Sequence, residues 1–484
     1  GAPFENDGKQ EHRILKVLNY VDHLKKMHVN AVYFSPLFES DTHGYNTRDY
    51  RKIDTRLGDE ADFIKVVDAL HKAGIRVILD GVFNHCGSFN KWLDREGIYD
   101  GEEGYDPGAY VSKDSPYHDF FRFFSSGEGD WPYNNSYDGW WGHDTLPKLN
   151  YEGSQKLEDY IIGIGRKWVS PPYNCDGWRL DVAADLGHSQ EYNHKFWKRF
   201  RREVKEANPE AIVLAEHYGD ASSWLAGDQW DTVMNYDAFM EPVSFFLTGM
   251  EKHSDRYEGE LFGNGRTFEI TMRHCMTEFL SPSLYCAMNQ LSNHDHSRFL
   301  TRTNHKVGRV SDLGSEAAGE DINIPVFKLA VLIQMTWPGA PTLYYGDEAG
   351  VVGFTDPDNR RTYPWGNVNE QLIDYHRDAI FMHRYHKALK LGSLIFLSTG
   401  RNFVSYGRFT RDEKMIIAIN SGDYEMDVTI PVWKAEVPAD CQITEVFKTS
   451  ERGYSIMQLS ADVKGGYLQA HLDPYTGIVW KKDL

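Results

Sequence analysis

The sequence predicts an α/β protein, a (β/α)8 barrel with an inserted domain after its third strand and a C-terminal antiparallel β-sandwich. Three observations predict this fold. Near-continuous apolar strands alternate with amphipathic helices over residues 14–389, which is typical of a parallel sheet. The alternation is interrupted by a long polar stretch after residue 85. From residue 394 onward, short strands of alternating polarity indicate a sandwich.

Each barrel element follows from the spacing of its apolar residues. Breakers support the boundaries, because Pro36 stops the first strand and Gly74 closes the second helix. In chain order we expect helix 14–27, strand 29–35, helix 62–73, strand 75–80, helix 155–169, strand 176–181, helix 192–206, strands 211–216, 230–236 and 285–292, helix 327–335, strand 341–345 and helix 372–389.

These elements include seven strands, whereas a closed (β/α)8 barrel has eight. The first expected element is a helix, so we expect the missing first strand to precede Gly1. Seven strands alone would leave two open sheet edges. The predicted domains are the barrel at 1–85 and 152–393, the insert at 86–151 and the sandwich at 394–484.

The polar stretch 86–151 is too long for a structureless loop in a compact domain, so we expect a small inserted domain there. It is rich in Gly, Asp, Trp and Tyr. It carries the motif L-P-K-L-N, Leu146 to Asn150, and the aromatic cluster Trp131, Tyr133, Trp140 and Trp141.

Composition excludes several classes of protein. A net charge of −19 over 484 residues argues against nucleic acid or an anionic membrane as the partner, and 41% hydrophobic residues argue against disorder. The five cysteines are widely spaced without a C-x-x-C, so we expect neither a disulfide framework nor a zinc site, and we favour the cytoplasm. No apolar run is long enough to span a membrane. Because the chain starts Gly1-Ala2-Pro3 without Met, a cleaved leader stays open. The oligomeric state is not predicted.

Polar side chains gather where the predicted strands end. Arg179 and Asp181 lie two residues apart on one strand and therefore point to the same face. A neighbouring cation keeps a carboxylate ionised, which makes Asp181 a candidate nucleophile, with a buried structural ion pair as the alternative. Three further clusters follow strand ends, namely Asp80 to His85, Glu216, and His294 with Asp295.

In a barrel the carboxyl ends of all strands meet over one face, so these four clusters predict a single site for a polar substrate. Each residue alone also has a structural interpretation. A lone His85 is more often a core or capping group, and the N-H-D motif at Asn293 could cap a helix. The convergence of six such residues favours the functional interpretation.

These motifs resemble the α-amylase superfamily of glycoside hydrolases. D-G-V-F-N-H, G-W-R-L-D-V-A, the strand ending in Glu216 and L-S-N-H-D are similar to its four signature regions and occur in the same order. L-P-K-L-N and S-W-L-A-G-D-Q-W-D-T-V-M-N-Y, Ser223 to Tyr236, resemble the neopullulanase, cyclomaltodextrinase and maltogenic amylase branch. The resemblance covers nearly the whole chain.

The resemblance implies a retaining hydrolase that cleaves α-glucosidic bonds, mainly α-1,4 and secondarily α-1,6, in short or cyclic α-glucans. It implies that Asp181 is the nucleophile, Glu216 the general acid/base and Asp295 the third acid. It assigns substrate binding to Tyr45, Asp80, His85, Arg179, His294, Asp356 and Arg360. The family chemistry requires no cofactor, and calcium stays open with Asn84 as its candidate ligand.

The sequence departs from the branch at His217-Tyr218, at Ala184-Asp185 and at Asn46, and the branch's N-terminal β-domain is absent from it. The first two departures flank subsites that receive the leaving sugar. A glycosyl-transferring or α-1,6-specific relative is therefore an alternative. From another class, non-catalytic carbohydrate-binding proteins or transporter partners share this fold, but those partners lack triad acids and carry a membrane span.

Overall fold

The computed structural model describes residues 4–124 and 136–484. Its chain divides into two compact units, Gly1–His217 with Ala221–Val233, and Tyr218–Asp220 with Met234–Leu484. Trp131 and Tyr133 of the predicted aromatic cluster lie outside the described residues. The predicted domain boundaries at 86, 151 and 393 stay predictions.

Unit 1 is built on a parallel sheet whose strand order is β1-β4-β5-β6-β7. The strands are β1 Ala31–Tyr33, β4 Arg76–Gly81, β5 Gly177–Leu180, β6 Ile212–Ala215 and β7 Thr232–Val233. Asp80 pairs in register with Arg179, and Leu180 with Ala215, so the three central strands end at one level. This register brings the residues at their carboxyl ends to one edge of the sheet.

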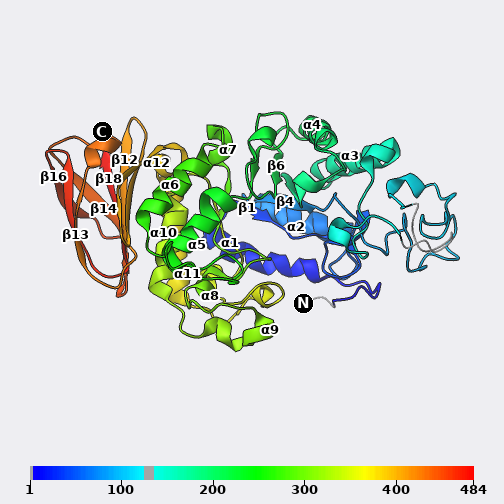
Figure 1. Cartoon of the computed structure of the whole chain (residues 1–484), viewed down its shortest axis with the longest axis horizontal. Helices are drawn as coiled ribbons and strands as arrows, with labels where there is room; N and C mark the ends of the chain where they lie inside the picture. Colours follow the sequence, from blue (N-terminus) through cyan, green and yellow to red (C-terminus); the bar gives the residue numbers. More distant parts are fainter. Residues whose placement is uncertain (1–3, 125–135) are drawn as a thin grey trace. The chain divides into compact units, whose positions relative to one another are not determined.

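The helices of unit 1 begin at the signals that the sequence carries. They are η1 Arg13–Tyr20, α1 Val21–Lys26, α2 Glu60–Lys72, α3 Gln155–Val169 and α4 Gln190–Ala207. Asp59 and Asp62 form a capping box at α2, and Ser154 and Ser189 cap α3 and α4. Helices α3 and α4 lie side by side (Figure 1), where an added Cβ at Gly165 would come within 2.6 Å of Phe200.

Two irregular regions of unit 1 carry side chains from the predicted site. The loop after β1 forms a hairpin of β2 Phe38–Ser40 and β3 Thr47–Ile53. The insert after β4 contains the short turns η2 His118–Phe120, η3 Trp140–Gly142 and η4 Tyr151–Gly153, joined by isolated bridges such as Gly139 with Pro147. The strained turn η5 Ala183–Asp185 follows β5, and η6 Ser222–Trp224 precedes β7.

Unit 2 begins with the remaining barrel strands. Strands β8 Met288–Gln290 and β9 Ala340–Thr342 pair in parallel, and Met234 forms a parallel bridge to Met288. The helical elements are η7 Tyr236–Met240, α5 Glu241–Thr248, α6 Gly265–Met276, α7 Ser281–Tyr285, α8 Phe299–Arg302, α9 Val310–Leu313, η8 Glu316–Gly319, α10 Ile324–Thr336, η9 Asp347–Ala349, η10 Asp358–Arg360, α11 Glu370–Tyr385, α12 Lys387–Leu391 and η11 Val432–Ala435. Helix α10 is buried on all sides, as its uniformly apolar sequence requires.

The C-terminal strands form one nine-stranded sheet of order β10-β11-β12-β18-β14-β16-β17-β13, with β15 paired to β14. They are β10 Ser393–Gly400, β11 Phe403–Phe409, β12 Glu413–Asn420, β13 Met426–Ile430, β14 Cys441–Ser450, β15 Gly453–Ser455, β16 Leu459–Lys464, β17 Tyr467–Leu472 and β18 Thr476–Asp483. Side chains from both ends of the sheet, such as Leu397 and Leu468, share one core. The sheet therefore folds over itself as the predicted sandwich (Figure 1).

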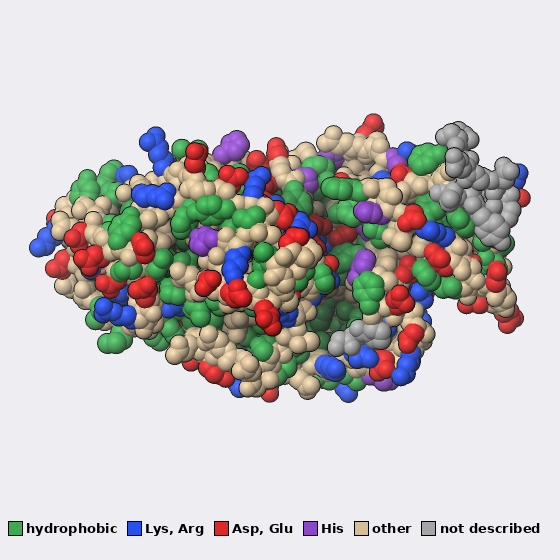
Figure 2. Space-filling view, turned by 60° about the horizontal axis from the view of Figure 1, so that its bottom comes forward, with side chains coloured by type: hydrophobic (Ala, Val, Ile, Leu, Met, Phe, Trp, Pro, Cys, Tyr) green, Lys and Arg blue, Asp and Glu red, His purple; other side chains and the backbone are tan. Residues whose placement is uncertain are grey.

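The fold class predicted from the sequence is confirmed. Within residues 4–124 and 136–484, seven parallel strands occupy the predicted positions, five in unit 1 and two in unit 2. No helix in this part of the chain is both long and apolar enough to cross a membrane. Acidic and basic side chains are interspersed on the face shown in Figure 2.

Candidate active site

Arg179 is the centre of the polar cluster in unit 1. Its guanidinium is fully buried on β5, and Nη1 lies 2.8 Å from Asp181 Oδ1 and 3.0 Å from Asp80 Oδ1. Its Nη2 lies 3.0 Å from Glu216 Oε2. One cation therefore contacts three carboxylates from the ends of three adjacent strands, as the register of the sheet predicts.

The electrostatics of this cluster follow from burial and from the excess of carboxylates. Burial alone would lower the pKa of Arg179, but the carboxylates of Asp80 and Glu216 raise it well above its ordinary value. Burial raises the pKa of Asp181 and of Asp80, while Arg179 opposes both shifts. Because burial outweighs the attraction of Arg179, the protonated forms of Asp80 and Asp181 are favoured relative to free carboxyl groups.

Two tyrosines complete the contacts of Asp80. The hydroxyls of Tyr33 and Tyr45 each donate to Asp80 Oδ2 at 3.0 Å. Burial raises the pKa of both hydroxyls well above the ordinary value, so both remain donors. Tyr33 was not predicted as a site residue. Its position at the end of an apolar strand is the signal that could have identified it.

The ring of His85, in the loop after β4, is neutral and held by two hydrogen bonds. Its Nε2 lies 2.9 Å from the carbonyl oxygen of Tyr45, and its Nδ1 lies 3.1 Å from Asn84 Nδ2. The carbonyl can only accept, so Nε2 carries the proton and Nδ1 accepts from the amide. Burial lowers the pKa of His85 to about 3, and the ring is therefore uncharged at neutral pH.

The turn after β5 links the carboxyl groups of Asp181 and Glu216. Val182 adopts a left-handed conformation with φ of 37°, which a β-branched side chain rarely does. Its N–H donates to Glu216 Oε2 at 3.0 Å. The strained residue thus links the position after Asp181 directly to Glu216, and such strain is typical of functional sites.

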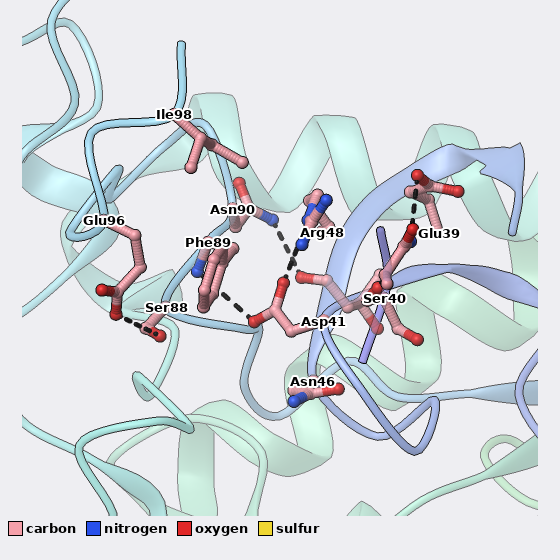
Figure 3. A network of polar contacts seen from close by, with 12 residues as sticks. Glu39, Ser40, Asp41, Asn46, Arg48, Ser88, Phe89, Asn90, Glu96 and Ile98 are labelled. Atoms are coloured by element: carbon pink, nitrogen blue, oxygen red, sulfur yellow. Dashed lines mark hydrogen bonds and ion pairs between the residues drawn. The ribbon is translucent and has the colours of Figure 1, made fainter. Parts of the chain in front are cut away.

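A second layer of polar contacts holds the loops that carry Tyr45 and His85 (Figure 3). Asp41 accepts from Arg48 Nε at 3.1 Å and from the Phe89 amide at 3.4 Å. An added Cβ at Gly87 would lie 2.2 Å from Asp41 Oδ2, so only glycine fits there. Burial raises the pKa of Asp41 to about 6, although Arg48 opposes the shift. This network joins the hairpin after β1 to the start of the insert.

In unit 2 the predicted residues His294 and Asp295 lie in the loop after β8. Asn293 Oδ1 accepts from the amides of Asp295 and His296 at 3.0 and 3.1 Å. His294 Nε2 lies 3.4 Å from Asp295 Oδ1, and the Asp295 side chain is 39% exposed. The turn is therefore held by neutral hydrogen bonds, and its carboxylate is far less buried than those around Arg179.

Asp356 and Arg360 form a separate ion pair in unit 2. Arg360 Nε lies 2.7 Å from Asp356 Oδ1, and both side chains are partly exposed. The predicted site residues are thus brought together in one cluster and two pairs. Tyr45, Asp80, Asn84, His85, Arg179, Asp181 and Glu216 cluster in unit 1, while His294 with Asp295 and Asp356 with Arg360 form pairs in unit 2.

The departures from the family pattern have structural partners. His217 packs against Trp224 and Trp230, whose rings are stacked 4.8 Å apart. In unit 2, Tyr218 stacks on Tyr236 at 4.1 Å. Asn46 closes its loop through two side-chain bonds, because Nδ2 donates to Thr42 Oγ1 and Oδ1 accepts from the Thr42 amide.

The residues around Asn84 do not fit a calcium ion. Asn84 Oδ1 accepts from the Lys148 ammonium at 2.6 Å, so a cationic group already uses the oxygen that calcium would need. Among the described residues, two clusters could hold a metal, His12 with Asp59 and Asp62, and Glu251 with His253 and Asp255. The first serves the N-cap of α2, and the second is paired with Lys252 and Arg309.

Comparisons with known proteins agree with this geometry. Residues 13–402 match the family model of the alpha amylase catalytic domain. An amylopullulanase of Thermoanaerobacterium saccharolyticum is 35% identical over 452 residues, covering 86% of this chain but only 33% of its own length. Neopullulanase 2 of Thermoactinomyces vulgaris is 32% identical over 471 residues, covering 96% of this chain and 69% of its own length.

A crystal structure of the debranching enzyme from Nostoc punctiforme has the same fold, with a TM-score of 0.77. It is 28% identical in sequence, and the match covers 96% of this chain and 88% of that chain. The chain spans about a third of the length of the amylopullulanase but most of the neopullulanase. The branch predicted from the sequence motifs is confirmed by the neopullulanase match.

Proposed function

Since the chain belongs to the alpha-amylase family, we propose that it is a retaining glycoside hydrolase of short or cyclic α-glucans. The observation that carries the proposal is the contact of one guanidinium, that of Arg179, with both Asp181 and Glu216. Two carboxyl groups held by one planar group favour the separation of about 5–5.5 Å that retaining enzymes use, rather than about 6.5–9.5 Å.

In the first step, Asp181 attacks the anomeric carbon while Glu216 donates a proton to the glycosidic oxygen. The bond from carbon to that oxygen breaks, the leaving sugar departs with the proton, and a glycosyl ester forms on Asp181. The contact of Arg179 with both carboxyl groups supports this step, because it holds Asp181 and Glu216 close to each other.

In the second step, Glu216 takes a proton from water, and the resulting hydroxide displaces Asp181 from the anomeric carbon. Arg179 holds the nucleophile's carboxylate and also pairs with Asp80. From the sequence motifs we assign His85 to substrate binding, with both of its ring nitrogens already bonded to Tyr45 and Asn84. From the sequence motifs, we assign the role of third acid to Asp295 and substrate binding to Tyr45, His294, Asp356 and Arg360. The proposed chemistry uses no cofactor.

We propose α-1,4 bonds as the main target and α-1,6 bonds as the second. The relatives support both linkages, because they include a neopullulanase, an amylopullulanase and a debranching enzyme. If a sugar hydroxyl replaces water in the second step, the same residues catalyse glycosyl transfer. We also propose a cytoplasmic location, because the five cysteines are widely spaced without a C-x-x-C.

Product analysis tests the proposal. The protein is incubated with cyclomaltodextrin, pullulan, maltotriose and α-1,6-linked oligosaccharides, beside Asp181→Asn and Glu216→Gln. We expect an α-anomer as the first product and no detectable turnover by Asp181→Asn. A β-anomer as the first product would disprove retention, and an Asp181→Asn protein as active as the parent would disprove the nucleophile.

Azide rescue separates the two roles. In Asp181→Ala, azide should replace the missing nucleophile and give a β-glycosyl azide. In Glu216→Ala the glycosyl ester still forms from an activated substrate, so azide should give an α-glycosyl azide. The same azide anomer from both variants would contradict the assigned roles.

A further inference from the structure

Of two adjacent tryptophans in the insert, Trp140 lies beside His85. The ring of Trp140 stacks on the His85 ring, with centroids 5.3 Å apart and planes at 19°. Backbone bridges of Gly139 with Pro147 and of His85 with Lys148 close this part of the insert. The position of Trp140 is therefore tied to a residue of the proposed site.

Asp185 fixes the other edge of the Trp140 ring. The indole Nε1–H donates to Asp185 Oδ2 at 2.9 Å, and an indole N–H can only donate. Lys148 Nζ donates to the Asp185 carbonyl at 2.5 Å and to Asn84 Oδ1 at 2.6 Å. Asp185 lies four residues after Asp181, so these bonds connect the turn of the proposed nucleophile to the insert.

Trp141 presents its ring to solvent from a strained backbone. Its side chain is 80% exposed, and its φ of 52° lies in the left-handed region that bulky residues avoid. Its ring centroid lies 5.6 Å from that of Trp140. An exposed indole contributes nothing to the core, whereas its flat apolar face with a polar edge matches the face of a pyranose ring.

We propose that Trp141 is a stacking platform for a glucosyl unit of the substrate, and that Asp185 is the positioning residue that holds this platform through Trp140. The inference rests on the proposed function and deepens it. It gives a role to the departure at Asp185, which acts on substrate preference through an aromatic ring rather than by touching the sugar.

A double-mutant cycle tests the inference on maltooligosaccharides of three to seven units. Trp141→Ala and Asp185→Ala should each raise KM about 10-fold for the longest substrate, with kcat lowered less than threefold. The double variant should show the same KM as the Asp185→Ala variant, because both changes remove one platform. Multiplied effects, about 100-fold together, would mean that the two residues act independently and would overturn the inference.

Conservative variants separate positioning from a general structural role. Asp185→Asn keeps an acceptor oxygen for the indole N–H and should restore most of the lost affinity. Trp141→Phe keeps a flat ring and should do the same. If Asp185→Ala fails to fold, the KM values of Trp141→Ala and Trp141→Phe are compared to test the platform. The KM values of Asp185→Asn and the parent are compared to test the positioning role. An Asn variant with a KM like that of Trp141→Ala would overturn that role.

The outcomes also distinguish this inference from the proposed function. If the parent protein cleaves α-glucans but Trp141→Ala has the parent's KM at every substrate length, the platform is disproved and the hydrolase stands. If the parent protein neither cleaves nor binds any α-glucan, the proposed function and the platform are both disproved.

Discussion

The Arg179 cluster of unit 1 and the Asp295 loop of unit 2 hold their carboxylates in different ways. Around Arg179, Asp80 and Asp181 are almost fully buried and are fixed by contact with one buried cation. In the loop after β8, Asp295 is 39% exposed, and its turn is fixed by the amide oxygen of Asn293.

The difference indicates which residues contribute to stability as well as to activity. In the Arg179 cluster, a change of charge alters the energy of a buried ion network, so it should change stability together with activity. In the Asp295 loop, the carboxylate is partly exposed and the turn is held by the amide oxygen of Asn293, so a change of charge should alter stability much less.

The largest effect is expected from neutralising one acid in each region, Asp181 in unit 1 and Asp295 in unit 2. Asp181→Asn should lower kcat by more than about 10⁴-fold. It should also raise the free energy of unfolding at pH 7 by roughly 1–3 kcal/mol, because it removes one of three buried negative charges. Since the folded-state pKa of Asp181 is raised, this gain should vanish as the pH falls below the unfolded value near 3.8.

Asp295→Asn is the matched comparison. It should also reduce activity, but urea unfolding should place its stability within about 0.5 kcal/mol of the parent. A loss of stability in Asp181→Asn, or a large stability change in Asp295→Asn, would contradict the distinction between the two regions.

The next effect concerns the cations. Arg179→Ala leaves three buried carboxylates without a counter-ion and should lower the free energy of unfolding by about 3–5 kcal/mol. Arg360→Ala breaks a partly exposed pair with Asp356 and should cost at most about 1 kcal/mol. Chemical denaturation of both variants measures the contrast, and equal losses would show that burial of the ion pair does not set its energy here.

Asp41 tests how far the charge network of unit 1 extends. Its pKa is raised to about 6 in the folded state, so its neutral form is favoured by folding. The resulting stabilisation, at most ~3 kcal/mol, is present below the unfolded value near 3.8 and is lost as the pH rises through about 6. Asp41→Asn should remove this pH dependence, although Arg48 and Glu96 remain nearby.

The measurement is the difference in unfolding free energy between variant and parent from pH 3.5 to pH 7. For Asp41→Asn, the stability of the variant relative to the parent should increase as the pH rises across this window. Asp114→Asn, at an exposed position outside this network, is the control variant. A flat line for Asp41→Asn would mean that Arg48 fully compensates the burial of this carboxyl.

Much of the fold was predictable because barrel strands are recognisable in the sequence as apolar runs that end in polar residues. Helix α3 was predicted at its observed bounds. Of the strand expected over 230–236, Thr232–Val233 forms the regular strand, and Met234 adds a single parallel bridge to Met288. Helices α5 and α6 were not predicted. Nearly all of α5 is buried, so it lacks the polar face that would mark a helical period.

The site was predictable where geometry depends on local spacing, as for Arg179 and Asp181 on one strand face. It was not predictable where distant irregular segments meet. The bond of Trp140 to Asp185 joins residues 45 positions apart, one of them in an insert whose described part is built from short turns and isolated bridges. No periodicity or motif encodes such a contact, and only the folded chain shows it.

An effect smaller than that of Arg179→Ala is expected from the neutral donors of the Asp295 loop. Asn359 is fully buried, and its Nδ2 donates to the carbonyls of Asn293 and His296 at 3.0 and 2.8 Å. Asn359→Ala leaves two carbonyls without this donor and should cost about 1–3 kcal/mol of stability. It should also lower kcat/KM by about 10-fold, because the loop that carries Asp295 loses its anchor. The nearly isosteric Asn359→Asp places a carboxylate against both carbonyls and should be worse in both assays. If instead Asn359→Asp matched the parent, a charge would be tolerated in this loop and the contrast with the Arg179 cluster would fail.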